Sequence, residues 1–202
     1  MNVRQFLWGL SNGVAVFAIA GAFWLGLGIG TAATHVAWQV SALSTVIQFG
    51  GCAALLLAGR RLRRRSGFLV SELRQGDGRR TPETQRILIG LRWTMAGQTA
   101  LIGLAVWICV RAGAEQLIWP AIALVVSLHL VPLAKIFHVR AYYVTAAIGS
   151  TAALAALAIR TPLYAVVFLA CSMAAVMWIS AGYLLASADR IAARGAGERW
   201  AV

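Results

Sequence analysis

Residues 162–186 read PLYAVVFLACSMAAVMWISAGYLLA, a run of 25 residues that contains no charged side chain. At a rise of about 1.5 Å per residue, a helix of this length crosses the ~30 Å hydrocarbon core of a bilayer. Lipid offers no partners to backbone N–H and C=O groups, so such a run spans as an α-helix. A hydroxyl residue followed by proline, as in Thr161-Pro162, is typical of a helix start. The run therefore predicts a transmembrane helix that begins at Pro162.

Five further apolar runs precede this one, at residues 6–29, 36–58, 93–110, 117–137 and 142–159. Each is close to the ~20 residues that a spanning helix needs. All 6 acidic residues of the chain lie outside the six runs. The sequence therefore predicts an all-α polytopic membrane protein in which residues 1–202 form one bundle of six transmembrane helices. A basic loop at residues 59–92 would join the second and third helices, and Thr81-Pro82-Glu83 predicts that the third begins near Pro82.

The composition supports the same class. Of the 202 residues, 60% are hydrophobic and 12% are charged, against about 25% charged in a soluble domain. The mean hydropathy is +0.77. The net charge of +12 would favour nucleic-acid binding in a soluble protein, but here the arginines cluster at the ends of apolar runs. We therefore expect the lipid bilayer as the partner and no nucleic acid.

The basic residues predict the orientation. All but two (Arg111 and Arg160) of the 18 Lys and Arg residues lie on the side of the termini and of the 59–92 loop. An excess of Lys and Arg is typical of cytoplasmic connections, and six spans also place both termini on one side. We therefore expect both termini in the cytoplasm and a location in the cytoplasmic (inner) membrane.

Five arginines stand at the end of the second run: Arg60, Arg61, Arg63, Arg64 and Arg65. Near a membrane surface, such a cluster interacts with anionic lipid headgroups at ~1 kcal/mol per charge. We interpret it as a headgroup anchor. A phosphorylated or acidic cytoplasmic ligand is the alternative, because arginine forks also suit phosphate.

The fourth run ends in residues 128–138, LHLVPLAKIFH. His129 lies well inside the apolar run, and an ionisable group within a membrane is a candidate for substrate contact or proton transfer. The alternative is a neutral imidazole that is hydrogen-bonded to a neighbouring helix. Pro132 has no N–H for the carbonyl of Leu128, so it predicts a kink in the helix.

This segment carries a resemblance. With the following Val139-Arg140-Ala141-Tyr142-Tyr143, it is similar to the fourth-span ending of small uncharacterised bacterial multi-pass membrane proteins. The shared pattern is His-x-x-Pro-Leu-Ala-Lys/Arg-x-Phe followed by a pair of tyrosines. The resemblance implies a bacterial source and brings no activity with it.

Amide side chains accompany His129 at similar predicted depth: Asn12, Gln48 and Gln98. Polar side chains facing lipid are unfavourable, so these groups must face other helices or a cavity. Together with His129 they are predicted to line a cytoplasm-facing path for a solute. The alternative is that they bridge helices, at ~0.6–2 kcal/mol for each contact.

Other residues predict structure rather than chemistry. Seven tryptophans fall mostly near run ends and fit an aromatic belt: Trp8, Trp24, Trp38, Trp93, Trp107, Trp119 and Trp178. The 3 cysteines lie in three different runs, so we expect no disulfide. We found no motif for a metal, a cofactor or a catalytic nucleophile, and expect none of them.

These features favour a non-enzymatic membrane protein that binds or transports a small neutral or anionic solute. Coupling to protons would use His129 and predicts activity that changes between about pH 5 and 8. The alternative is a membrane subunit or assembly partner, with a homo-oligomer also open. A weaker alternative is a lipid-headgroup enzyme that uses His129 or His138 at the inner surface.

Overall fold

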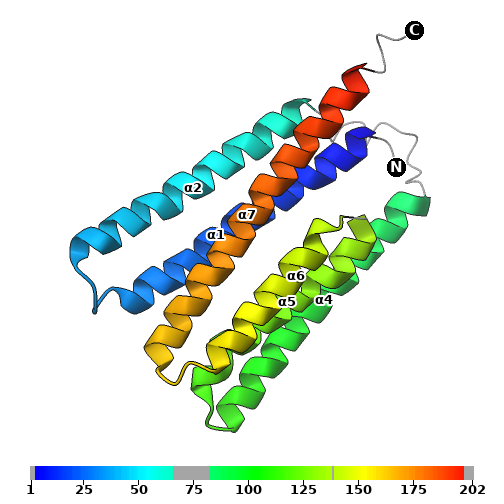
Figure 1. Ribbon diagram of the computed structural model, residues 1–202. Helices are drawn as coiled ribbons and strands as arrows, with labels where there is room; N and C mark the ends of the chain where they lie inside the picture. The colour runs from blue at the N-terminus through cyan, green and yellow to red at the C-terminus, as the bar shows by residue number, and fades with distance from the viewer. Residues whose placement is uncertain (1–2, 66–81, 138, 198–202) are drawn as a thin grey trace.

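The computed structural model describes residues 3–65, 82–137 and 139–197, which form helices joined by short connections (Figure 1). In chain order the elements are α1 (Val3–Ala32), α2 (Trp38–Arg65), α4 (Pro82–Arg111), the 3-10 helix η1 (Glu115–Leu117), α5 (Ile118–Phe137), α6 (Ala141–Leu157) and α7 (Pro162–Gly197). The predicted all-α class is confirmed for this part of the chain.

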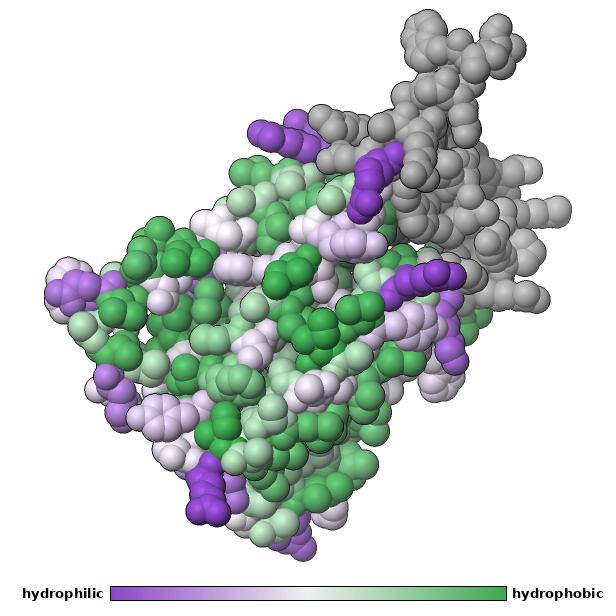
Figure 2. Space-filling model, viewed as in Figure 1, coloured by the Kyte–Doolittle hydropathy of each residue, from purple (hydrophilic) through white to green (hydrophobic). Residues whose placement is uncertain are grey.

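Five of the helices are long and apolar enough to cross a membrane: Leu10–Ala32, Trp38–Arg64, Ile89–Arg111, Glu115–Phe137 and Pro162–Ala188. The sixth, α6, is also apolar but has only 17 residues. Figure 2 shows an apolar surface between two ends at which hydrophilic residues gather. The prediction of a helical, multi-pass membrane protein is confirmed at this level.

Helix starts agree with the sequence patterns better than helix ends do. α4 begins at Pro82 and α7 begins at Pro162, as the two hydroxyl-proline pairs predict. In contrast, α2 continues through its arginines to Arg65, beyond the predicted end of the apolar run at residue 58. Arginine is a good helix former, so the helix does not stop where the hydrophobic stretch does.

The helices form two groups of three (Figure 1). In the first, α1 packs along both α2 and α7; in the second, α5 packs against α4 and α6. The two groups meet mainly where α6 packs against α7. The first residue of α1 and the last of α7 lie at the same end of the bundle.

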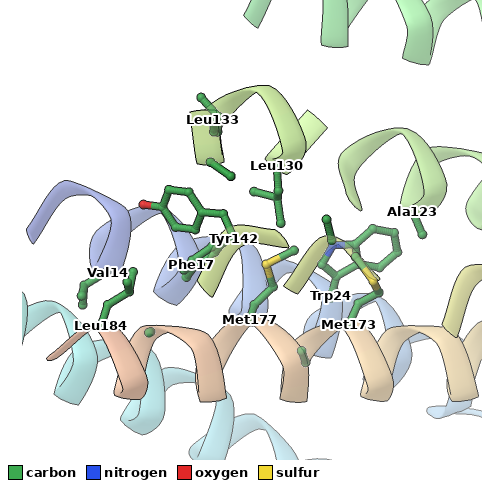
Figure 3. Packing of buried hydrophobic residues seen from close by; sticks show 14 of the residues in the cluster. Val14, Phe17, Trp24, Ala123, Leu130, Leu133, Tyr142, Met173, Met177 and Leu184 are labelled. Carbon is green, nitrogen blue, oxygen red and sulfur yellow. The ribbon is translucent and has the colours of Figure 1, made fainter. Parts of the chain in front are cut away.

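The core lies between these groups and is centred on α7. Leu169, Met173, Met177 and Leu184 of this helix are almost fully buried. Met173, Met177 and Leu184 face α1 and the second group (Figure 3). There Tyr142 of α6 makes edge-to-face contacts with Phe17 and Phe137. Packing of α7 from both sides explains why it is the most buried of the candidate spans.

The predicted aromatic belt is only partly correct. Trp38, Trp93 and Trp107 are largely exposed, with 60–75% of their surface accessible. Trp24, however, is 2% exposed and packs edge-to-face on Trp119. Its ring fills the core rather than the membrane interface, so the prediction is wrong for this residue.

Candidate functional site

The hairpin of α4 and α5 carries two of the predicted polar residues. Gly113 follows α4 with φ of 65°, a left-handed conformation that suits glycine, and the chain returns through η1 into α5. A Cβ atom at Gly90 would lie 3.3 Å from Cδ1 of Ile136. This close approach sets the register of the two antiparallel helices.

His129 lies on the α4-facing side of α5. It stands seven residues before Ile136, two turns and roughly 10 Å away on the same face. The register places Gly97, seven residues after Gly90, at the same level. Gly97 is exposed, and no atom of α5 lies within 4 Å of the position that a Cβ there would take.

The imidazole of His129 has an unpaired atom. Its Nε2 is buried and has no hydrogen-bond partner among the residues that the structure describes. Leaving a buried polar atom unpaired costs about 1–3 kcal/mol. His129 therefore presents a buried hydrogen-bonding atom that the described residues leave unpaired.

Gln98 and Pro132 lie close to the level of His129 along the helix axes. Gln98 directly follows Gly97 on α4 and is half-buried, so the structure brings it to the depth of His129. Pro132 is exposed on α5, which continues without interruption from Ile118 to Phe137. The predicted weak point of the helix therefore lies one turn from His129.

Gln48 belongs to a different part of the bundle. Its Nε2 donates a 2.9 Å hydrogen bond from α2 to the carbonyl oxygen of Ala22 on α1. The amide lies where a Cβ at Gly26 would be, 2.5 Å from Nε2. In this position Gln48 joins two helices, which is the role that the bridging alternative predicts.

Asn12 lies apart from Gln48 and from the α4–α5 hairpin. It is half-buried on α1, ten residues before Ala22 and thus about 15 Å from the contact of Gln48 along the axis. The carbonyl of the adjacent Ser11 approaches the position of a Cβ at Gly59 to 3.6 Å. Asn12 is thus level with the basic end of α2, and the four polar residues do not share one depth.

The arginine cluster forms the last turns of α2. Leu62 is buried there, while Arg60, Arg61, Arg63 and Arg64 are exposed around it. The apolar side chain attaches the helix end to the core and leaves the cations on the surface. The side chain of Arg65 and the whole of His138 lie outside the described part of the chain.

Sequence reasoning missed a buried polar contact between α6 and α7. The hydroxyls of Thr145 and Ser180 are 2.6 Å apart, and Thr145 Oγ1 also donates to the carbonyl of Ala141 at 2.9 Å. Since the proton of Thr145 is used within its own helix, Ser180 is the donor between the helices. Ser and Thr are frequent in membrane helices, so neither residue stood out in the sequence.

Within the described ranges, no group of three or more His, Cys, Asp or Glu side chains comes close enough to hold a metal ion. Comparison with protein families, with functionally characterised proteins and with solved structures finds no match.

Proposed function

We propose that the protein binds a small neutral or anionic solute or transports it across a membrane, and that His129 is the central contact of the solute. The observation that carries this proposal is the buried Nε2 atom of His129, which lacks a partner among the described residues. A buried polar group without a partner is unfavourable unless a ligand or water completes it. A solute at this position would provide the missing hydrogen bond.

The proposed path runs along the α4–α5 hairpin. Gln98 adds an amide on α4 at the depth of His129. A helix segment containing a proline has one backbone hydrogen bond fewer, so Pro132 makes this end of α5 the element that moves. The exposed arginines at the end of α2 would attract anions to the entrance.

The same proposal includes a topology. We place all six helices across a bacterial cytoplasmic membrane, with both termini in the cytoplasm. At 17 residues α6 is short, but it is apolar and within the range of natural spanning helices. The bias of Lys and Arg toward the end that carries the termini supports this orientation.

A second candidate is a membrane subunit or assembly partner. The bond from Gln48 to Ala22 favours it, because a predicted path-lining residue here holds two helices together. In addition, α2 packs mainly against α1 and, more sparsely, against α7, and many of its described side chains are exposed and thus open to lipid or to another protein. This candidate predicts a co-purifying partner and a stability that does not respond to solutes.

Thermal unfolding of the purified protein against a panel of small solutes tests the proposal. A solute that binds the folded state stabilises it by about 2.7 kcal/mol at a hundredfold excess over Kd. We expect a dose-dependent shift in Tm that disappears in His129→Ala. His35→Ala is the matched control, because His35 is exposed and its Nδ1 lies 2.8 Å from Thr34 Oγ1 in a connection.

A stabilising solute that acts equally on His129→Ala would place its binding site elsewhere and contradict the role of His129. If no solute stabilises either protein, the assembly-partner candidate becomes the better explanation. Purification in mild detergent would then be used to identify the partner.

A further inference from the structure

The contact between α6 and α7 is closed toward one end of the bundle and open toward the other. Nearer the end that carries the termini, the Thr145 and Ser180 hydroxyls join the two helices at 2.6 Å. Farther along, an open groove of about 500 Å³ extends from Ala147 to Ala155 on α6 and along Phe168 to Val176 on α7. Side chains from only these two helices line it.

The walls of the groove are mainly apolar, with the hydroxyls of Thr151 on α6 and Ser172 on α7 as the polar side-chain groups. Ala147 and Ala155 are exposed, and Ile148 between them is 50% exposed. The one hydroxyl on the α6 wall, Thr151 Oγ1, donates to the carbonyl of Ala147 at 2.9 Å and so has no proton to offer an occupant. Such walls suit hydrocarbon rather than water, which needs two or more polar partners.

The groove follows the axes of the two helices. From Ala147 to Ala155 it is about 12 Å long at 1.5 Å per residue. Because it is open along its outer side, an elongated apolar group could lie in it without separating α6 and α7.

A cation lies where the groove ends. The chain crosses from α6 to α7 through residues 158–161, so this connection borders the outer end of the groove. It carries Arg160, which is exposed and follows Ala155 by five residues. The planar guanidinium of arginine binds phosphate through two parallel hydrogen bonds.

We propose that the α6–α7 groove binds an acyl chain of an anionic phospholipid whose phosphate is bound by Arg160. The lipid would occupy the leaflet at the end of the bundle opposite the termini. It would fill the open part of the contact between the two helix groups, at a place separate from His129. This lipid site is therefore independent of the proposed solute path.

Native mass spectrometry of the full-length protein in detergent, with added dioleoylphosphatidylglycerol, tests this site. We expect Ala155→Phe, which fills the groove, to weaken binding at least about tenfold. Arg160→Gln should weaken binding similarly, and dioleoylphosphatidylcholine should bind less well than phosphatidylglycerol. Matched controls are Ala100→Phe on an exposed position of α4 and Arg111→Gln at the same end of the bundle; both should bind like the original protein.

Two results would overturn the proposal. One is equal phosphatidylglycerol binding by all variants, which would mean that the lipid lies elsewhere. The other is a loss of dimers in Ala155→Phe with unchanged lipid binding, which would assign the groove to a second copy. Ala147→Phe fills the other end of the groove from an exposed position, and it serves if Ala155→Phe does not fold. If inorganic phosphate alone displaces the bound phosphatidylglycerol, the site binds free phosphate rather than a phospholipid.

Discussion

Trp178 on α7 and Ala18 on α1 are joined by a hydrogen bond of 3.2 Å between the indole Nε1 and the carbonyl oxygen. The same ring lies against two glycines. A Cβ at Gly51 of α2 would be 2.8 Å from Cη2 of the indole, and one at Gly21 of α1 would overlap its Cδ1. Because one side chain fills the space that both glycines leave, it holds α1, α2 and α7 together.

Gly51→Ala should therefore destabilise the protein, although alanine is the better helix former. Adding a methyl group to a filled interior typically costs about 1–3 kcal/mol, which we expect to appear as a lower Tm in detergent. Gly50→Ala is the matched control, because no atom lies within 4 Å of its Cβ position. It should leave Tm unchanged or raise it, because alanine in place of glycine adds up to ~1 kcal/mol of helix propensity to the free energy of unfolding. Equal effects of the two substitutions would contradict the packing of Trp178.

Local patterns predicted the helices well, because their causes are local. A capping hydroxyl and a proline act within one turn, so the starts of α4 and α7 at Pro82 and Pro162 could be predicted. Apolar length reports only the part of a helix that lies in lipid. It therefore missed the extension of α2 through Arg65, where arginines continue the helix beyond its apolar run.

Contacts between helices could not be predicted in the same way. The bond of Gln48 to Ala22 depends on the register of α1 and α2 and on the space that Gly26 leaves. Nothing in one helix encodes that register. The unpaired Nε2 of His129 could not be predicted either, because it depends on which residues of the neighbouring helices lie opposite.

Gln48→Leu should destabilise the pairing of α1 and α2. Loss of a hydrogen bond between membrane helices typically costs ~0.6–1.7 kcal/mol. Gly26→Ala should cost a similar amount, because its Cβ would collide with the amide of Gln48. The double variant should be less destabilised than the sum, since leucine can move away from the new methyl group. Unfolding free energies of the four proteins measure this coupling, and strict additivity would argue against the contact.

The hydroxyl pair of Thr145 and Ser180 should be coupled as well. Ser180→Ala removes the donor, and Thr145→Val removes the acceptor on the opposite helix. We expect each substitution to lower the unfolding free energy and the double variant to cost about 0.6 kcal/mol less than their sum. Thr99→Val is a control, because the Thr99 hydroxyl is exposed and bonds only within α4. A coupling energy of zero would mean that the two hydroxyls do not interact.

Cysteine labelling can test whether α6 crosses the membrane. In a protein whose natural cysteines are replaced by alanine, Arg140→Cys and Thr161→Cys place single thiols at exposed positions before and after α6. A membrane-impermeant maleimide should label Thr161→Cys in intact cells and Arg140→Cys only after permeabilisation. Arg64→Cys and Gln116→Cys are exposed controls for the two sides. Labelling of positions 140 and 161 from the same side would exclude a crossing by α6.

His129→Leu should separate stability from solute binding. Leucine removes the buried Nε2 that has no partner in the described part of the chain, so the unfolding free energy should stay the same or rise by up to ~1–3 kcal/mol. The solute-dependent shift in Tm should disappear in the same variant. His129→Gln keeps a hydrogen-bonding group at this depth and should retain part of the shift. A His129→Leu protein that is strongly destabilised and still responds to the solute would make His129 a structural residue, because the imidazole would then stabilise the bundle without contacting the ligand.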